Sequence, residues 1–177
     1  DIISKSPQDI DFTRIVTTVT DASTVRQTID TNKVINDRVQ LRFNGLLQDG
    51  AVAGRDVVTD DREGAAMAVR FKATEALILE GNLSYTKIEQ TPDWGVPFVN
   101  NADLGVVGPV TEYGVDRTTF YGVPGRDFQT VEETVGTAKA QYSFGNGLTL
   151  TNTLRLSKST NDYVLTAPSR LIDNDSA

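Results

Sequence analysis

Apolar and polar residues alternate with a period of two along several long stretches of this chain. The clearest is Val39–Asp49, and the pattern recurs over Leu77–Lys87 and Leu148–Ser157. Such a strand buries one face in an apolar environment and leaves the other face wet. A half-buried soluble sheet has this pattern, and so does the wall of a water-filled membrane barrel. The choice between these two structures decides the function.

The alternation and the turn residues predict about seven strands, at residues 12–20, 24–34, 38–48, 60–71, 77–90, 128–144 and 148–165. We expect an antiparallel meander in which each strand pairs with its sequence neighbour. One face should carry Leu41, Phe43, Val69, Phe71, Leu79, Leu83, Ala140, Leu150 and Leu154. The other face should carry Arg42, Asn44, Glu80, Asn82, Lys139, Thr151 and Arg155. Long stretches with a helical period are absent from the sequence.

The predicted connections differ in length. Those at 35–37, 72–76 and 145–147 are short, whereas 49–59 and 91–127 are long, and the short turn at 21–23 is the exception. The 91–127 segment is expected to be irregular, because it holds four of the six prolines, Pro92, Pro97, Pro109 and Pro124. Short turns on one rim and long loops on the other are typical of outer-membrane barrels. The predicted strands also exceed the usual five or six residues of soluble sheets.

Composition narrows the function classes. The 177 residues include no cysteine and no histidine, which removes thiol nucleophiles, zinc fingers and Ser-His-Asp triads. The net charge of −7 argues against a nucleic-acid partner. We expect no enzyme activity, no cofactor and no metal site. No apolar run reaches the length of a membrane helix. The start of the chain lacks the apolar core of a signal peptide, which is expected of a mature, a truncated or a cytosolic chain.

Two long loops on the same predicted rim carry the candidate ligand-binding residues Arg55, Trp94, Tyr113, Arg117, Tyr121 and Arg126. Aromatic rings can stack on a flat ligand, and guanidinium groups suit anionic acceptors. The alternative is that the aromatic residues pack the loop on itself and that the arginines pair with Asp56, Asp116 and Asp127. In 91–127 the acidic residues Asp93, Asp103, Glu112, Asp116 and Asp127 outnumber Arg117 and Arg126, so an anion would be attracted only if the arginines are segregated.

Several segments, in order, resemble TonB-dependent siderophore receptors of the catecholate type. They are Ile2–Pro7 (the end of the plug), Asn44–Asp49 and Ala53–Val58 (the third barrel strand and its loop), Pro92–Pro97 with Phe120–Gly122 and Arg126–Phe128 (an outer loop), and Tyr163–Pro168 (the seventh strand). Asp1 and Ser4 stand where the family usually has Asn and Thr. The resemblance implies an all-β segment of about seven strands from a 22-stranded outer-membrane barrel.

The same resemblance implies two regions, residues 1–10 as the end of the plug and 11–177 as the N-terminal part of the barrel. It implies uptake of a ferric siderophore across a Gram-negative outer membrane, contact with lipid and lipopolysaccharide, and a TonB partner that acts on a missing N-terminal part. Two alternatives remain from the residues. One is a complete eight-stranded structural or adhesive barrel, and the other is a soluble glycan-binding β-sandwich.

Overall fold

The computed structural model describes residues 5–101 and 105–168. In these residues a seven-stranded antiparallel sheet has the order β1-β2-β3-β4-β5-β8-β9, and a two-stranded hairpin, β6-β7, lies in the connection between β5 and β8. A short 3-10 helix, η1, follows the hairpin. The bounds are β1 Phe12–Val19, β2 Val25–Asn36, β3 Val39–Asp49, β4 Asp60–Lys72, β5 Leu77–Gln90, β6 Phe98–Asn101, β7 Val106–Pro109, η1 Val110–Tyr113, β8 Phe128–Ser143 and β9 Thr149–Val164.

The predicted meander is confirmed, and the strand ends differ from prediction by at most two residues. The largest difference is at the end of β2, which runs on to Asn36 through a bulge between Val34 and Asn36. The prediction that 91–127 is irregular is correct for most of the described segment but missed three short elements. This segment contains β6, β7 and η1, because the β-branched and aromatic residues of Phe98–Asn101 pair with Val106–Pro109.

Strand register divides the side chains as the alternation predicted. One continuous row of paired residues crosses the sheet as Leu41, Val69, Gly81, Ala138 and Leu154, and the adjacent row is Arg42, Ala68, Asn82, Thr137 and Arg155. The first row is apolar, whereas the second row is mostly polar. Since successive residues of a strand point to opposite faces, the two rows lie on opposite sides of the sheet.

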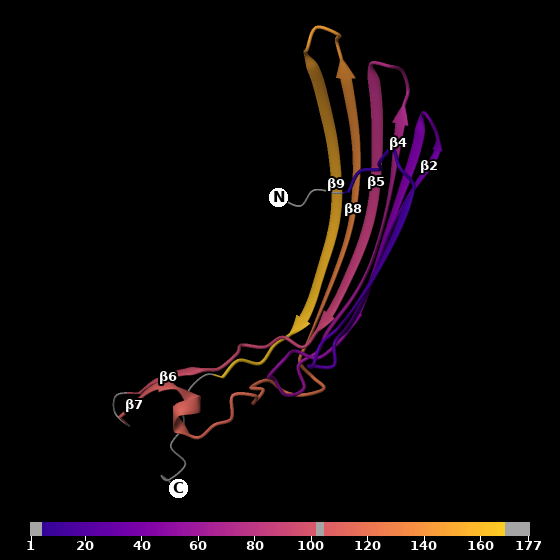
Figure 1. Cartoon of the computed structure of the whole chain (residues 1–177). Helices are drawn as coiled ribbons and strands as arrows, with labels where there is room; N and C mark the ends of the chain where they lie inside the picture. The colour runs from indigo at the N-terminus through magenta and orange to yellow at the C-terminus, as the bar shows by residue number, and fades with distance from the viewer. Residues whose placement is uncertain (1–4, 102–104, 169–177) are drawn as a thin grey trace.

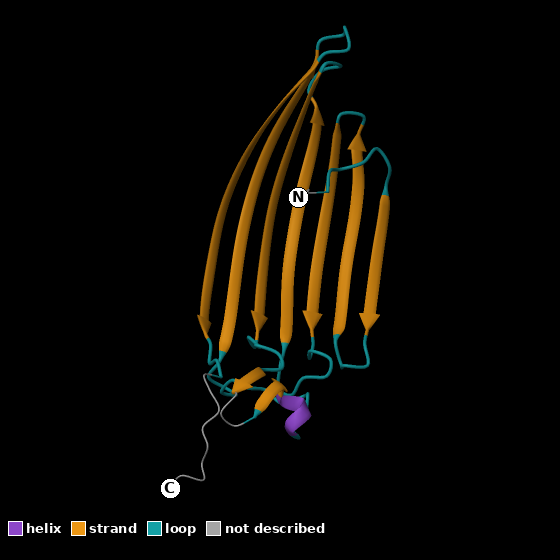
Figure 2. Cartoon of the chain, turned by 90° about the vertical axis from the view of Figure 1, so that its left-hand side faces the viewer, coloured by secondary structure: helices purple, strands orange, loops and turns teal. Residues whose placement is uncertain are grey.

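The sheet is bowed, and the start of the described chain lies against its concave side (Figure 1). Figure 2 views this side directly and shows the N-terminal segment crossing in front of the strands. Lys5 and Ser6 contact Asp30, Asn44 and Glu80, which therefore belong to the concave face. The predicted polar set thus faces inward, and the predicted apolar set faces outward.

Large apolar side chains are exposed on the convex face. Phe43 is 42% exposed, Met67 60%, Leu83 58% and Leu154 57%. Along β5 this apolar surface runs from Leu77, paired with Tyr142, to Tyr85, and covers about 27 Å of strand at about 3.4 Å per residue. A band of this height bordered by tyrosines matches the outward apolar band of an outer-membrane barrel.

No helix in the described part of the chain is long and apolar enough to cross a membrane.

The assignment of faces predicts unequal effects for two arginine substitutions on β9. In the complete barrel that the sequence resemblance implies, Leu154→Arg should lower the free energy of unfolding by about 2–4 kcal/mol, because a guanidinium would enter the hydrocarbon. Thr151→Arg, on the concave face of the same strand, should change it by less than about 0.5 kcal/mol. Urea unfolding in lipid vesicles measures both values, and equal losses would contradict the assignment.

Candidate functional site

The concave wall holds the N-terminal segment through a network of charges. The guanidinium of Arg42 donates to both carboxylate oxygens of Asp30, at 2.9 and 2.8 Å, and to the carbonyl oxygen of Ser6 at 2.8 Å. Lys5 Nζ donates to Asp30 Oδ2 at 2.8 Å and to Asn44 Oδ1 at 3.0 Å. The Arg42 and Asp30 side chains are only 9% and 16% exposed, so the pair is largely shielded from water.

Asn32 fixes the next part of the same segment. Its side chain accepts a hydrogen bond from the Gln8 amide at 2.8 Å and donates to the carbonyl oxygens of Gln8 and Ile10, at 2.8 and 2.7 Å. The residue is 2% exposed. Asp9 extends the contact by pairing with Lys72 at 2.9 Å. Residues 5–11 are therefore bonded to strands from β2 to β5 rather than lying loosely on them.

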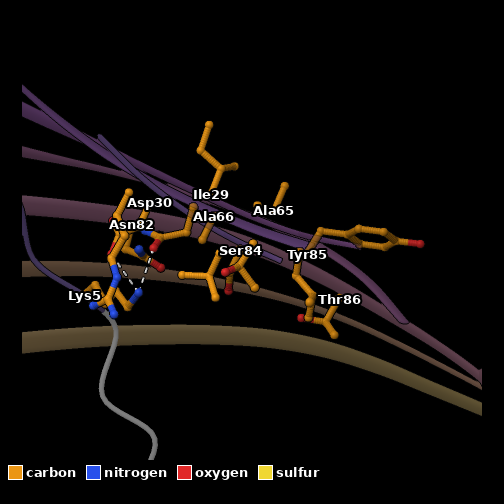
Figure 3. A pocket seen from close by; sticks show the side chains of 16 residues that line it. Lys5, Ile29, Asp30, Ala65, Ala66, Asn82, Ser84, Tyr85 and Thr86 are labelled. Atoms are coloured by element: carbon orange, nitrogen blue, oxygen red, sulfur yellow. Dashed lines mark hydrogen bonds and ion pairs between the residues drawn. The ribbon is translucent and has the colours of Figure 1, made fainter. Parts of the chain in front are cut away.

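Beside this network the concave wall is hollowed. A space of about 460 Å³ lies next to Lys5 and is lined by polar side chains such as Asp30, Ser84 and Thr86 together with apolar ones such as Val16 and Leu46. Figure 3 shows Lys5, Asp30 and Asn82 together at one end of the hollow, whereas Ile29 projects from the opposite side of the sheet. The sheet thus presents a mixed surface to this hollow, with its charged and polar groups gathered at the Lys5 end.

The two long loops are joined at the other end of the sheet by Arg55. Its Nε and Nη2 donate to the two carboxylate oxygens of Asp93, at 2.6 and 2.8 Å. Its Nη1 donates to the carbonyl oxygen of Arg117 at 2.5 Å, and Nη2 also donates to that of Gly95 at 3.2 Å. The Arg55 side chain is 9% exposed and that of Asp93 15%. A guanidinium has five N–H donors, and four hydrogen bonds within the protein already occupy most of those of Arg55.

A second contact continues this junction. The Asp56 amide donates to the carbonyl oxygen of Thr118 at 2.7 Å, and the Thr118 hydroxyl donates to Asp56 Oδ2 at 3.0 Å. The next residue, Val57, has a φ of 53°, which is unfavourable for a β-branched residue and costs about 1–3 kcal/mol. The Asp56 bonds before Val57, and the hydrogen bond from the Val52 amide to the Val58 carbonyl oxygen after it, hold the loop in this strained conformation.

The three aromatic candidates lie in different surroundings. Trp94 is 58% exposed, at a turn where the Gly95 amide donates to Asp93 Oδ1. The Tyr113 hydroxyl accepts from the Val107 amide and donates to the Val107 carbonyl, so it ties η1 to β7. The Tyr121 hydroxyl is buried, and no partner for it is found among the described residues. Trp94 is therefore the candidate ring most open to a ligand, and Tyr113 already packs the loop on itself.

The other two candidate arginines, Arg117 and Arg126, are exposed. Arg117 makes no side-chain hydrogen bond or ion pair with the described residues, although its carbonyl is held by Arg55. Arg126 is 58% exposed, donates to the Thr166 hydroxyl at 2.8 Å and lies 3.3 Å from Asp127. The sequence offered two alternative ion pairs, Arg55 with Asp56 and Arg126 with Asp127. In the structure Arg55 pairs with Asp93 instead, and Arg126 pairs with Asp127.

Asp127 is an internal support of the returning loop. Its carboxylate accepts from the Val123 amide at 3.1 Å and from the amide and hydroxyl of Thr166, both at 2.8 Å, and its side chain is fully covered. Gly122 permits this approach, because a Cβ there would lie 2.5 Å from Asp127 Oδ2. The loop's return is thus bonded to the end of β9.

Burial and hydrogen bonding act in opposite directions on the two covered carboxylates. Burial raises the pKa of Asp93, but the Arg55 side chain and the Gly95 amide lower it by more, so the pKa lies below 3.8. Burial likewise raises the pKa of Asp127, but the Thr166 hydroxyl and the amides of Val123 and Thr166 bring it below 3.8. Both groups are ionised at neutral pH, and both are covered while Arg117 and Arg126 face solvent.

Sequence reasoning found the candidate loops but missed the side chains that organise them. Asp93 was counted only as an opposing charge, yet it is the partner of Arg55, 38 residues away in the chain. Lys5, Asp30 and Asn32 were not identified as an anchor. The Asp-Trp-Gly spacing, typical of a turn closed by an aspartate side chain, was the only local signal for Asp93.

Sequence comparison finds relatives among bacterial receptors. The chain is 31% identical over 169 residues to the probable TonB-dependent receptor BfrD of Bordetella pertussis, and 29% identical over 171 residues to the catecholate siderophore receptor Fiu of Escherichia coli K12. Each match covers 94% of this chain and 22% of the relative, so the chain spans about a fifth of the length of these curated relatives. No family model matches the chain.

Solved structures agree with these matches. The siderophore receptor PiuA of Acinetobacter baumannii superimposes with a TM-score of 0.81 at 29% identity, covering 90% of this chain and 23% of that one. The closed form of Fiu gives 0.81 at 28% identity, covering 92% and 23%. The chain is similar, over nearly its whole length, to TonB-dependent siderophore receptors. It corresponds to one stretch of their outer-membrane barrel, and the alternatives of a soluble sandwich and a complete eight-stranded barrel are not supported by these matches.

The Arg55–Asp93 pair gives this receptor segment a definite pH response. Asp93 has a lowered pKa in the folded state, so the pair contributes stability above about pH 4 and loses it as the pH falls through the folded pKa. Hydrogen exchange of the Asp56 amide in the complete receptor, corrected for its intrinsic rate, should be equally slow at pH 7 and pH 5. Protection should fall below pH 4. Loss of protection between pH 7 and pH 5 would show that Asp93 does not support the loop.

Proposed function

We propose that this chain forms the N-terminal barrel wall and the end of the plug of an outer-membrane receptor that binds a ferric catecholate siderophore and imports it with TonB. The observation that carries the proposal is the bonding of residues 5–11 across a polar concave wall, opposite an apolar convex face. A soluble sheet has no need of an apolar outer face on long strands, whereas a lipid-embedded barrel requires one.

The same contacts support the domain assignment that we propose. We assign residues 1–10 to the end of the plug and 11–177 to the barrel; residues 1–4 and 169–177 lie outside the described part of the chain. The described part, Lys5–Ile10, is held by side chains of β2 to β5 and adds no strand to the sheet. An inner segment fixed to the wall in this way is what a plug enclosed by a barrel needs at the point where the chain passes from one to the other.

The loop geometry favours an anionic, aromatic ligand. Asp93 and Asp127 are covered and internally bonded, so the acidic total of the loop overstates the negative charge that a ligand would meet. Arg117 and Arg126 remain exposed on the same rim as Trp94. A ferric catecholate combines negative charge with flat rings, which suits arginines and a tryptophan.

The apolar convex face supports the membrane contacts that we propose. We assign the band between Tyr142 and Tyr85 to outer-membrane lipid. The charged row of Glu63, Lys87 and Glu132, on the loop side of that band, is assigned to the level of the lipopolysaccharide headgroups. The ferric siderophore is the transported ligand, not a cofactor, and the iron chemistry belongs to it.

Replacing Trp94 and Arg117 by alanine in the complete receptor should weaken binding of a ferric catecholate by roughly 30-fold to 2000-fold. A charge-assisted hydrogen bond contributes about 1.5–3 kcal/mol and an aromatic stack about 0.5–1.5 kcal/mol, at about 1.4 kcal/mol per decade. Titration with ferric catecholates and ferric hydroxamates measures the change. Loss for the catecholates alone supports the proposed substrate class.

Unchanged affinity for every ligand that the parent receptor binds would remove these two residues from the site. Failure of iron-starved cells to take up radioactive iron from any siderophore through the parent receptor would contradict the function itself.

A further inference from the structure

Arg55 was expected to contact the ligand, but its surroundings point to another role. Four of its donor contacts go to Asp93, Gly95 and Arg117, and its side chain is 9% exposed. A ligand anion could reach this guanidinium only by displacing Asp93, which holds it with two short, charge-assisted bonds. Arg55 is therefore committed to the protein before any ligand arrives.

The groups that Arg55 holds adjoin the two best-exposed candidates. Asp93 and Gly95 are the residues on either side of Trp94, and Arg55 bonds to both of them. Arg55 also holds the carbonyl of Arg117, whose side chain is exposed. One largely covered guanidinium thus fixes the backbone from which both Trp94 and Arg117 project. Asp56, the residue after Arg55, bonds to Thr118, the residue after Arg117, and so reinforces the same junction.

We propose that Arg55 and Asp93 are positioning residues, which join the two outer loops and present Trp94 and Arg117 as a fixed pair to an anionic aromatic chelate. The inference rests on the proposed siderophore-binding function and deepens it. A site whose groups are already placed loses less conformational entropy on binding, so affinity depends on residues that never touch the ligand.

The decisive variant is Asp93→Asn in the complete receptor. The asparagine oxygen still accepts from the Gly95 amide, so the local turn persists, but the charge that holds Arg55 is lost. If Arg55 positions the loops, affinity for a ferric catecholate should fall at least tenfold. If Arg55 instead contacts the ligand, removing its partner frees a positive charge, and affinity for the anion should rise. The two roles therefore predict opposite signs.

Asp116→Asn is the matched control. Asp116 lies in the same loop and carries the same charge, but its carboxylate accepts from the Thr118 amide rather than pairing with Arg55. The control variant should bind as tightly as the parent or slightly more tightly. Retained barrel mobility on unheated detergent gels shows that each variant is folded. Equal loss of affinity in the two variants would overturn the assignment to Asp93.

A second readout does not depend on the ligand. The receptor is labelled with 5-fluorotryptophan, and the fluorine signal of Trp94 is identified by its absence in Trp94→Phe. In the ligand-free receptor, Asp93→Asn should shift or broaden this signal, and Asp116→Asn should leave it unchanged. An unchanged Trp94 signal in Asp93→Asn overturns the positioning role even if affinity falls. A parent receptor that binds no ferric catecholate would overturn the proposed function, while the fluorine signal would still decide the role of Arg55 and Asp93.

Discussion

The register of the hydrogen-bonded ladder is the constraint on which the rest of this structure depends. Each strand is paired with its neighbour along nearly its whole length, and a shift of one residue would exchange the two faces of that strand. In hydrocarbon such a shift would expose Arg42 and Glu80 to lipid and turn Leu41 and Leu79 inward. Because backbone polar groups cannot be left unpaired in lipid, the ladder also has to be continuous.

The correct register creates the polar wall that holds the N-terminal segment. Arg42 lies opposite Asn32 and Asp30 lies opposite Asn44, so four of the side chains that anchor residues 5–11 come from two paired positions on β2 and β3. Asp30 is shared between Arg42 and Lys5, which balances its charge on a largely covered surface. Burying a charge is tolerable only when it is paired in this way.

At the rim a different kind of order applies. Apart from the short β6-β7 hairpin, loops 50–59 and 91–127 are joined to each other by a few hydrogen bonds and ion pairs, of which the Arg55–Asp93 pair is the most shielded. Contacts within and between the loops accompany the positive φ of Val57 and the close approach of Gly122 to Asp127. A rim of this kind can keep a tryptophan and an arginine exposed in fixed places, as recognition of a flat anion requires.

Most of the sheet could be predicted from the sequence because alternation is a local property. Leu77–Gln90 was predicted with its observed limits, and the facing of Leu83, Asn82 and Arg155 was correct. The loop contacts could not be predicted, since nothing local connects Arg55 with a carboxylate 38 residues away. Prolines and glycines obscured the β6-β7 hairpin, and the role of Asn32 depends on a segment that crosses the sheet without pairing as a strand.

The central claim is that the polar face of this sheet is the inner face and holds the end of the plug. Ser6 Oγ lies 3.2 Å from Glu80 Oε2 on that face, while Leu79, the neighbouring residue, points outward. The chain has no cysteine, so each pair can be introduced against a clean background in this segment of the complete receptor. A short thiol-specific crosslinker should join Ser6→Cys to Glu80→Cys, and it should not join Ser6→Cys to Leu79→Cys. Crosslinking to position 79 instead of position 80 would contradict the account.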